Sequence, residues 1–216
     1  MIHLVLLAAG GALRYGEKKQ FIKIGGKELW QWSLERFINL VDDAVVVVPE
    51  KDTGKFRTAE YTIPIDIKPG GKTRLQSSYI GTKELTGGIV LIHDAARPLA
   101  SSALIKRVIE KAKLFEAAVP VVSISDTIKL VKNDRIVRTV ERDEYKFVQT
   151  PQGFKTELIK EALESAVMKS LELTDDAAAV ELIGRSVYAV EGEKSNIKLT
   201  YQEELKFIKQ ELSKLA

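Results

Sequence analysis

A doubly wound α/β fold on a mostly parallel sheet is the architecture predicted for this 216-residue chain. Short apolar runs alternate with amphipathic stretches along most of the sequence. The apolar runs are nearly continuous, as parallel strands covered by helices on both faces require. Hydrophobic residues make up 45% and charged residues 29% of the chain, which is typical of a globular protein with a core. Together these observations predict a Rossmann-like sheet with right-handed crossovers, into which a β-hairpin arm is inserted.

The individual elements follow from this alternation. Strands are expected where apolar runs are bounded by turn residues, at Ile2–Leu7, Ala44–Val48, Ile63–Ile67, Ile89–His93, Ala117–Val122 and Ser186–Val190. Apolar residues at helical spacing predict helices over Leu29–Ile38, Arg74–Glu84, Ser102–Phe115 and Thr156–Lys169. A last helix is expected to open with the capping-box sequence Thr200-Tyr201-Gln202-Glu203 and to continue to Leu215.

One segment departs from the alternation. Two β-like runs, Thr127–Val131 and Arg135–Val140, flank the turn sequence Lys132-Asn133-Asp134, which predicts a hairpin. So small a hairpin is marginal in water unless it packs on something else. An arm that contacts a second subunit and an edge hairpin folded back on the domain both satisfy this need. Because no repeat or linker interrupts the chain, we expect a single domain over residues 1–216, with the arm inserted at residues 126–143.

Composition excludes several kinds of chemistry. Lys and Arg number 33 against 30 Asp and Glu, an excess far below that of a dedicated nucleic-acid binder. The absence of cysteine removes disulfides, thiolate metal sites and cysteine nucleophiles. The two histidines, His3 and His93, are too few for a histidine-rich metal site, and each is expected to be structural. The apolar start, Ile2–Ala9, lacks a basic leader and is too short to span a bilayer, so a cytoplasmic location without membrane contact is expected.

The strongest functional signal follows the first strand. Small residues at positions 8–12 are followed by Arg14, Gly16 and Lys19. A loop of small residues at a strand end lets backbone N–H groups approach an anion, and the two bases favour a triphosphate. The spacing is neither a Walker loop nor the dinucleotide fingerprint. A structural turn with ordinary surface bases is the alternative.

A second group of residues stands at the end of the Ile89–His93 strand, where the sequence reads His-Asp-Ala-Ala-Arg-Pro. Asp94 is well placed there to hold Mg²⁺ against phosphate oxygens, and Arg97 offers a bidentate fork to a phosphate. The alternative is that Asp94 caps the next turn and pairs with Arg97.

Two further residues lie later in the sequence. Thr174 precedes two acidic residues and is expected to cap a helix. Lys198 is expected in a short apolar strand, where a nearby anion would satisfy its charge.

Taken together, these motifs resemble the 2-C-methyl-D-erythritol 4-phosphate cytidylyltransferases, a family of sugar-nucleotidyltransferase-like α/β enzymes. The resemblance spans Leu6 to Lys198, and its most specific pieces are Leu-Ala-Ala-Gly, His-Asp-Ala-Ala-Arg-Pro, Asp-Thr-Ile-Lys, Thr-Pro-Gln, Thr-Asp-Asp-Ala and Asn-Ile-Lys-Leu-Thr. It implies a Mg²⁺-dependent transfer from CTP to a sugar-alcohol phosphate by a homodimer whose arms reach the neighbouring site. The phosphate loop departs from the family pattern, because Lys18 stands where proline is usual and the loop is short.

The resemblance also implies roles for single residues. Arg14, Lys19 and Lys198 would act on the reacting phosphates, and Asp94 would bind Mg²⁺ and substrate. The nucleotide would be bound by Ala8, Ala9, Gly10, Gly71, Lys72, Ser77 and Ala95. The sugar phosphate would be bound by Asp94, Arg97, Thr127, Arg142, Thr150 and Thr174, with Thr127 and Arg142 donated by the partner's arm.

The implied chemistry suits the composition. A substrate phosphate attacks the α-phosphorus of CTP and releases pyrophosphate, so no histidine or cysteine has to remove a proton. Two alternatives remain at this point: a ribitol-5-phosphate cytidylyltransferase, which performs the same chemistry on another sugar alcohol, and a catalytically silent nucleotide-binding module. The joint presence of Arg14, Lys19, Asp94 and Lys198 argues against the silent module.

Overall fold

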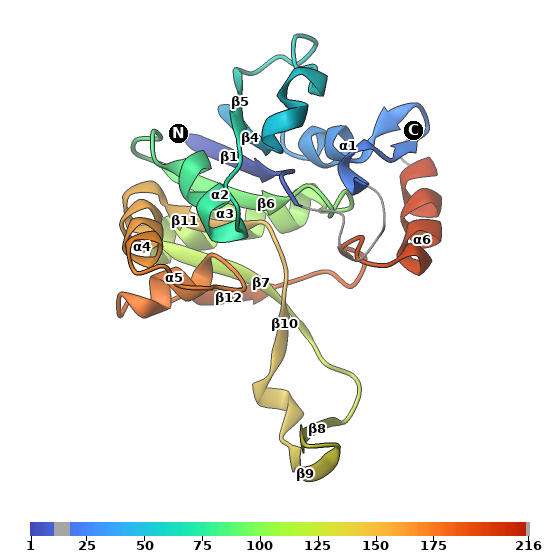
Figure 1. The fold of residues 1–216 in the computed structure, drawn as a ribbon, viewed down its shortest axis with the longest axis vertical. Coiled ribbons are helices and arrows are strands. Elements are labelled where there is room, and N and C mark those ends of the chain that lie inside the picture. Colours follow the sequence, from blue (N-terminus) through green and yellow to red (C-terminus); the bar gives the residue numbers. More distant parts are fainter. Residues whose placement is uncertain (11–17, 215–216) are drawn as a thin grey trace.

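A computed structural model describes residues 1–10 and 18–214. Within them eight strands form one twisted sheet (Figure 1). Seven of these strands follow the order β10-β7-β11-β6-β1-β4-β5, and the eighth, β12, also pairs with β7. The strands of this sheet are β1 (Ile2–Leu7), β4 (Asp43–Val48), β5 (Ile65–Pro69), β6 (Ile89–Asp94), β7 (Ala117–Ser123), β10 (Lys146–Val148), β11 (Gln152–Lys155) and β12 (Tyr188–Glu191). The predicted α/β class with a mostly parallel sheet is confirmed, since all strands except β10 and β11 run in one direction.

The order of the strands marks where a ligand can bind. From β1 the chain moves to β4 and β5 on one side and then returns to place β6 on the other side of β1. Because the strand order reverses at β1, loops that leave β1 and β6 diverge and open a crevice at their carboxyl ends. Leu7 pairs with Asp94 in the register of these two strands, so both strands end at this crevice.

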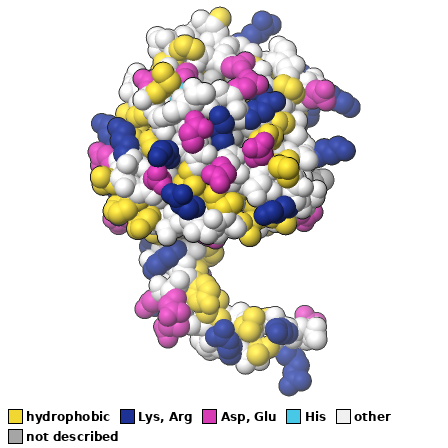
Figure 2. Space-filling view, turned by 90° about the vertical axis from the view of Figure 1, so that its left-hand side faces the viewer, with side chains coloured by type: hydrophobic (Ala, Val, Ile, Leu, Met, Phe, Trp, Pro, Cys, Tyr) yellow, Lys and Arg dark blue, Asp and Glu magenta, His cyan; other side chains and the backbone are white. Residues whose placement is uncertain are grey.

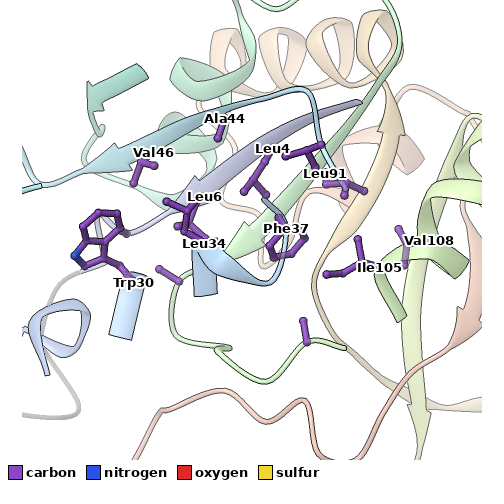
Figure 3. Packing of buried hydrophobic residues seen from close by; sticks show 14 of the residues in the cluster. Leu4, Leu6, Trp30, Leu34, Phe37, Ala44, Val46, Leu91, Ile105 and Val108 are labelled. Carbon is purple, nitrogen blue, oxygen red and sulfur yellow. The ribbon is translucent and has the colours of Figure 1, made fainter. Parts of the chain in front are cut away.

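Helices cover both faces of the sheet, as the apolar strands require. On one face α1 (Leu29–Glu35) and α3 (Ser102–Phe115) pack on alternate strand residues such as Leu4 and Leu91 (Figure 3). On the other face lie α2 (Arg74–Thr82), α4 (Thr156–Met168) and α5 (Ala177–Leu182). The final helix, α6 (Gln202–Ser213), packs with its buried Ile208 and Leu212 on a third, smaller cluster. None of these helices is both long and apolar enough to cross a membrane.

The remaining elements are short. β2 (Lys23–Ile24) and β3 (Lys27–Glu28) form a small hairpin before α1, and three 3₁₀ turns cover Lys19–Phe21, Glu50–Lys55 and Arg142–Glu144. The predicted arm is a second hairpin of β8 (Ile128–Lys132) and β9 (Arg135–Val140). It lies at the end of a stalk that extends β7 and β10 away from the body, as Figures 1 and 2 show.

The arm carries apolar side chains on both of its faces. Ile128 lies opposite Val140 in the hairpin, and an irregularity after Leu130 places Val131 opposite Ile136. Directly paired residues point to the same side of a two-stranded ribbon, so Val131 and Ile136 share one face. Val131 lies an odd number of residues after Ile128, so the pair of Ile128 and Val140 lies on the other face. Val131 and Ile136 remain 53% and 66% exposed. The rest of the described chain therefore leaves Val131 and Ile136 uncovered, and the folded-back hairpin of the sequence analysis is not observed.

Three sequence expectations are wrong in detail. Lys198 is expected in a short strand, but residues 197–200 form a loop. The N–H of the next residue, Leu199, donates to Ala96 O at 2.8 Å and holds this loop. The N-cap position before α5 belongs to Asp176 rather than Thr174, and the Asp175 carboxylate accepts a bond from Ala178 N. The final helix is capped at Tyr201, one residue later than expected, because Glu204 accepts the Tyr201 N–H.

Candidate active site

A cavity of about 430 Å³ opens at the carboxyl ends of β1 and β6, where the strand order reverses. It collects small residues from the loop after β1, the Gly-Gly segment before α2, the turn after β6 and the loop before α6. Its lining includes most of the predicted nucleotide and phosphate residues, namely Ala8, Ala9, Gly10, Lys19, Gly71, Lys72, Ser77, Asp94, Ala95 and Lys198. Four segments that are distant in the sequence thus converge on one polar pocket.

Asp94 lies at the centre of the charges in this pocket. Its carboxylate accepts a bond from Lys198 Nζ at 2.6 Å and one from Arg74 Nε at 3.4 Å. Burial opposes ionisation of this carboxyl, but the charges of Arg74 and Lys198 outweigh burial and hold the pKa of Asp94 well below its usual range. Asp94 is therefore a carboxylate under ordinary conditions, and it does not pair with Arg97 as the alternative interpretation required.

Arg74 links Asp94 to a second buried carboxylate. Its Nη2 donates to Asp176 at 2.7 Å, and Asp176 is only 1% exposed. Burial works against the Arg74 charge, yet the carboxylates of Asp176 and Asp94 raise the pKa of Arg74 overall. Arg74 is thus held as a cation between two anions. The Lys198 side chain, by contrast, is 43% exposed and can move towards an incoming phosphate without leaving Asp94 unpaired.

Lys19 enters the pocket from the other side. It begins a 3₁₀ turn directly after the phosphate-loop region, and its Nζ donates to Leu199 O and Thr200 O at 3.0 and 3.1 Å. These two carbonyls follow Lys198, so both lysines converge on the loop before α6. The preceding residue, Lys18, forms an ion pair with buried Asp52, to which Lys55 also binds at 2.8 Å. This ion-paired cluster fastens Lys18, the first described residue after position 17, to the connection after β4.

At the cavity the Gly-Gly segment before α2 and the loop after β1 approach each other closely. A Cβ on Gly70 would lie 2.5 Å from Ala9 Cβ, so only glycine allows these two segments to meet. Gly71 N–H donates to Ser77 Oγ at 3.2 Å, and Lys72 N–H donates to the Gln76 amide oxygen at 2.8 Å. The Ser77 hydroxyl in turn donates to Thr73 O at 3.0 Å, so these groups are bonded to one another at the rim of the cavity.

Beside Asp94 the predicted sugar-phosphate residues are tied together. Thr150 is buried, and its hydroxyl accepts the Asp94 N–H at 3.2 Å and contacts His93 Nδ1 at 3.0 Å. Arg97 donates from Nη1 to Asn196 O at 2.7 Å. His93 is completely buried, and burial lowers its pKa to about 4. The structural role expected for His93 is confirmed.

Three predicted residues lie away from the cavity of their own chain. Thr127 and Arg142 are exposed on the arm, where Arg142 Nη1 donates to Ser125 O at 2.5 Å. Thr174 is exposed, one residue before the acidic pair that contacts Gln152 and Arg74. A fourth predicted residue, Arg14, belongs to residues 11–17, which lie outside the described residues.

Sequence reasoning missed Arg74 and Asp176. Arg74 was visible as the first residue of the helix after the Gly-Gly turn, and Asp176 as the second of two adjacent acids. Their positions can be explained locally, because Arg74 begins α2 and Asp176 occupies the N-cap position of α5. Only tertiary packing brings the starts of α2 and α5 together and places Arg74 Nη2 2.7 Å from the Asp176 carboxylate.

A metal at this site would need oxygen ligands beyond the side chains of the described residues. Among residues 1–10 and 18–214, no three His, Asp or Glu side chains converge into a metal-binding group. Mg²⁺ commonly binds through one or two carboxylates, with water and substrate phosphates completing its octahedron. The ionised carboxylate of Asp94, facing a cavity lined by Lys19, Lys72 and Lys198, fits that arrangement.

Comparisons with known proteins point the same way as the geometry. A family model described as 2-C-methyl-D-erythritol 4-phosphate cytidylyltransferase (IspD) matches residues 2–213. The protein of that name from Clostridium beijerinckii is 39% identical over 215 residues, covering 95% of each chain. The crystal structure of the Thermus thermophilus protein of that name aligns with a TM-score of 0.82 at 34% identity, covering 97% of this chain and 98% of the other. A 4-diphosphocytidyl-2C-methyl-D-erythritol synthase structure from Anaerococcus prevotii gives a TM-score of 0.86 at 29% identity, covering 98% of both chains.

The buried state of His93 predicts sensitivity to mild acid. The unfolded chain binds a proton at this histidine near its ordinary pKa of 6.5, whereas the folded chain does so only near 4. The free energy of unfolding should therefore fall as the pH drops from 6.5 to 4, by on the order of 3 kcal/mol from this residue. Urea unfolding at a series of pH values measures the fall. The variant His93→Gln should show a shallower dependence, and an unchanged slope would contradict the assignment.

Proposed function

This chain belongs to the 2-C-methyl-D-erythritol 4-phosphate cytidylyltransferase family, and from that membership we infer its reaction. It joins CTP and 2-C-methyl-D-erythritol 4-phosphate into 4-diphosphocytidyl-2-C-methyl-D-erythritol and releases pyrophosphate, in the non-mevalonate isoprenoid pathway. The observation that supports this reaction most directly is the convergence of Lys19, Lys198 and ionised Asp94 on one cavity at the sheet's switch point.

The chemistry places few demands on acid–base groups. The second pKa of a phosphate monoester is about 6, so the attacking phosphate is largely dianionic near neutral pH. An oxygen of this phosphate bonds to the α-phosphorus of CTP, and the bond from that phosphorus to the bridging oxygen breaks, releasing pyrophosphate. The protein therefore has to bring two polyanions into line and stabilise the charge that develops between them.

We assign that stabilisation to cations around the cavity. Lys19 is fixed by the carbonyls of Leu199 and Thr200 at the phosphate end, and Arg14 would join it there. Lys198 is ion-paired with Asp94 but half exposed, so it can transfer its donors to the α-phosphate. In this assignment Asp94 would hold Mg²⁺, which when bound neutralises charge on the phosphate oxygens.

The cytidine is assigned to the part of the cavity lined by Gly71, Lys72 and Ser77. On binding, the edge of the cytosine ring would replace the bonds that the Gly71 and Lys72 N–H groups make to Ser77 and Gln76. Ala8, Ala9 and Gly10 would line the triphosphate, and Ala95 the ribose. The sugar phosphate would then bind beside Asp94, near Arg97, Thr150 and Thr174.

We further propose that the active protein is a homodimer formed through the arm. The apolar pair of Val131 and Ile136 on the arm is exposed, and so are Tyr145 and Phe147 on the stalk, at 47% and 61%. An uncovered apolar face on a two-stranded ribbon needs a partner, and a second copy of the chain supplies one. The same contact would carry Thr127 and Arg142 to the neighbouring cavity, which neither residue reaches in its own chain.

Substrate preference tests the reaction directly. With CTP and Mg²⁺, pyrophosphate release should be faster with 2-C-methyl-D-erythritol 4-phosphate than with ribitol 5-phosphate, and it should be absent without a sugar phosphate. Faster turnover of ribitol 5-phosphate would contradict the assignment. Tight CTP binding in calorimetry without turnover of either substrate would instead indicate a silent nucleotide-binding module.

A complementation assay tests the shared site. Lys19→Ala should lower kcat/KM by about a hundredfold, because one contact to the developing charge is lost. Arg142→Ala should also be impaired, because it removes a sugar-phosphate contact. Mixing the two variants should restore roughly a quarter of wild-type activity, because half of the dimers are mixed and each has one intact site.

Matched controls separate these effects from loss of charge alone. Lys23→Ala and Arg135→Ala remove exposed cations from β2 and from the arm and should leave turnover near wild type. Near-normal turnover of folded Lys19→Ala would contradict the role of Lys19. If mixing restores nothing, or if light scattering shows a monomer at the assay concentration, the shared site is wrong.

A further inference from the structure

Four hydrogen bonds form a closed ring beside the cavity. His93 Nε2 lies 3.0 Å from Arg97 O, and His93 Nδ1 lies 3.0 Å from the Thr150 hydroxyl. Thr150 O accepts from the Asn196 amide at 2.8 Å, and Asn196 O accepts from Arg97 Nη1 at 2.7 Å. The ring joins three separate segments: the turn after β6, the connection between β10 and β11, and the loop that leads to Lys198.

The direction of the bonds at His93 is determined by its partners. A backbone carbonyl can only accept, so Nε2 carries the hydrogen that is donated to Arg97 O. A neutral imidazole has one N–H, which leaves Nδ1 as an acceptor, and the Thr150 hydroxyl must donate to it. The same hydroxyl then accepts the Asp94 N–H at 3.2 Å. Every polar atom of the His93 and Thr150 side chains is thereby committed inside the protein.

This pattern fixes both ends of the turn that carries Asp94. Arg97 N–H donates to Asp94 O at 2.9 Å, closing the turn, and Ala95 N–H donates to Leu7 O at 3.0 Å. His93 holds the Arg97 end directly and the Asp94 end through Thr150. We propose that His93 is a positioning residue for the transfer reaction, which locks the Asp94–Arg97 turn against Thr150 and thereby fixes the Asp94 carboxylate relative to Lys198.

The proposal rests on the proposed function and changes the role of one residue. The Thr150 hydroxyl hydrogen points to His93, so this hydroxyl has no hydrogen left for a substrate phosphate. Thr150 therefore acts through the Asp94 backbone rather than as a phosphate donor. His93 packs against Phe37 with ring centroids 4.8 Å apart, which holds the imidazole plane and prevents water from replacing its bonds.

Variants of His93 separate positioning from packing. His93→Phe keeps a ring against Phe37 but loses both hydrogen bonds, whereas His93→Asn keeps an acceptor near the position of Nδ1. We expect His93→Phe to lower kcat by about ten- to hundredfold, as loss of groups that orient a metal ligand does, with a much smaller change in KM for CTP. His93→Asn should recover a large part of the lost kcat. Thr150→Val combined with His93→Phe should be no slower than Thr150→Val alone, because the two residues act as one unit.

Several outcomes would overturn the proposal. The first is a kcat of folded His93→Phe within twofold of wild type. The second is a double variant whose loss of kcat equals the product of the losses in Thr150→Val and His93→Phe. The third is an equal loss of kcat in His93→Phe and His93→Asn. The nitrogen chemical shifts of His93 in the wild-type protein provide a readout that needs neither substrate nor a variant. They should show protonated Nε2 and bare Nδ1, and the opposite tautomer would refute the ring. If wild-type protein fails to turn over 2-C-methyl-D-erythritol 4-phosphate, the proposed function fails, while the tautomer still tests the ring.

Discussion

The buried charge of Asp94 is the constraint on which the rest of the site depends. An ionised carboxylate can remain at the end of a core strand only if cations accompany it, because its desolvation is otherwise prohibitive. Arg74 and Lys198 meet that need from two different elements, and Asp176 in turn balances Arg74. The arrangement therefore ties α2, β6, α5 and the loop before α6 into one electrostatic unit, which forms only when the whole sheet has assembled.

The two cations differ in a way that suits the chemistry. Arg74 is held between two carboxylates, so it is a fixed counter-charge. Lys198 and Lys19 come from neighbouring segments at the cavity rim, and Lys198 is half exposed. The site thus keeps Asp94 ionised by the fixed Arg74 charge, while the Lys198 ammonium group is accessible at the cavity. A reaction between two phosphate esters needs such charge rather than a proton acceptor, which is consistent with a chain that has no cysteine and two histidines.

The sequence predicted those helices and strands that depend on patterns of neighbouring residues. The boundaries of α3 match the residues expected from helical spacing, and the buried strands follow their apolar runs. Interactions between distant segments escaped prediction: β11 enters the sheet antiparallel between β6 and β7, and Lys198 lies in a loop that Ala96 O fixes. Arg74 and His93 look ordinary in the sequence for the same reason, since their roles depend on Asp176, Thr150 and Arg97. Motif resemblance found the cavity residues, whereas tertiary packing alone showed what holds them.

The central claim, that an ionised Asp94 organises the transfer site, is tested most directly by the isosteric variant Asp94→Asn. The measurement is pyrophosphate release from CTP and 2-C-methyl-D-erythritol 4-phosphate across a range of Mg²⁺ concentrations, with thermal unfolding as the check on folding. We predict a fall in kcat/KM of about a hundredfold or more that high Mg²⁺ does not restore. A folded Asp94→Asn protein with turnover and Mg²⁺ dependence close to wild type would contradict the account.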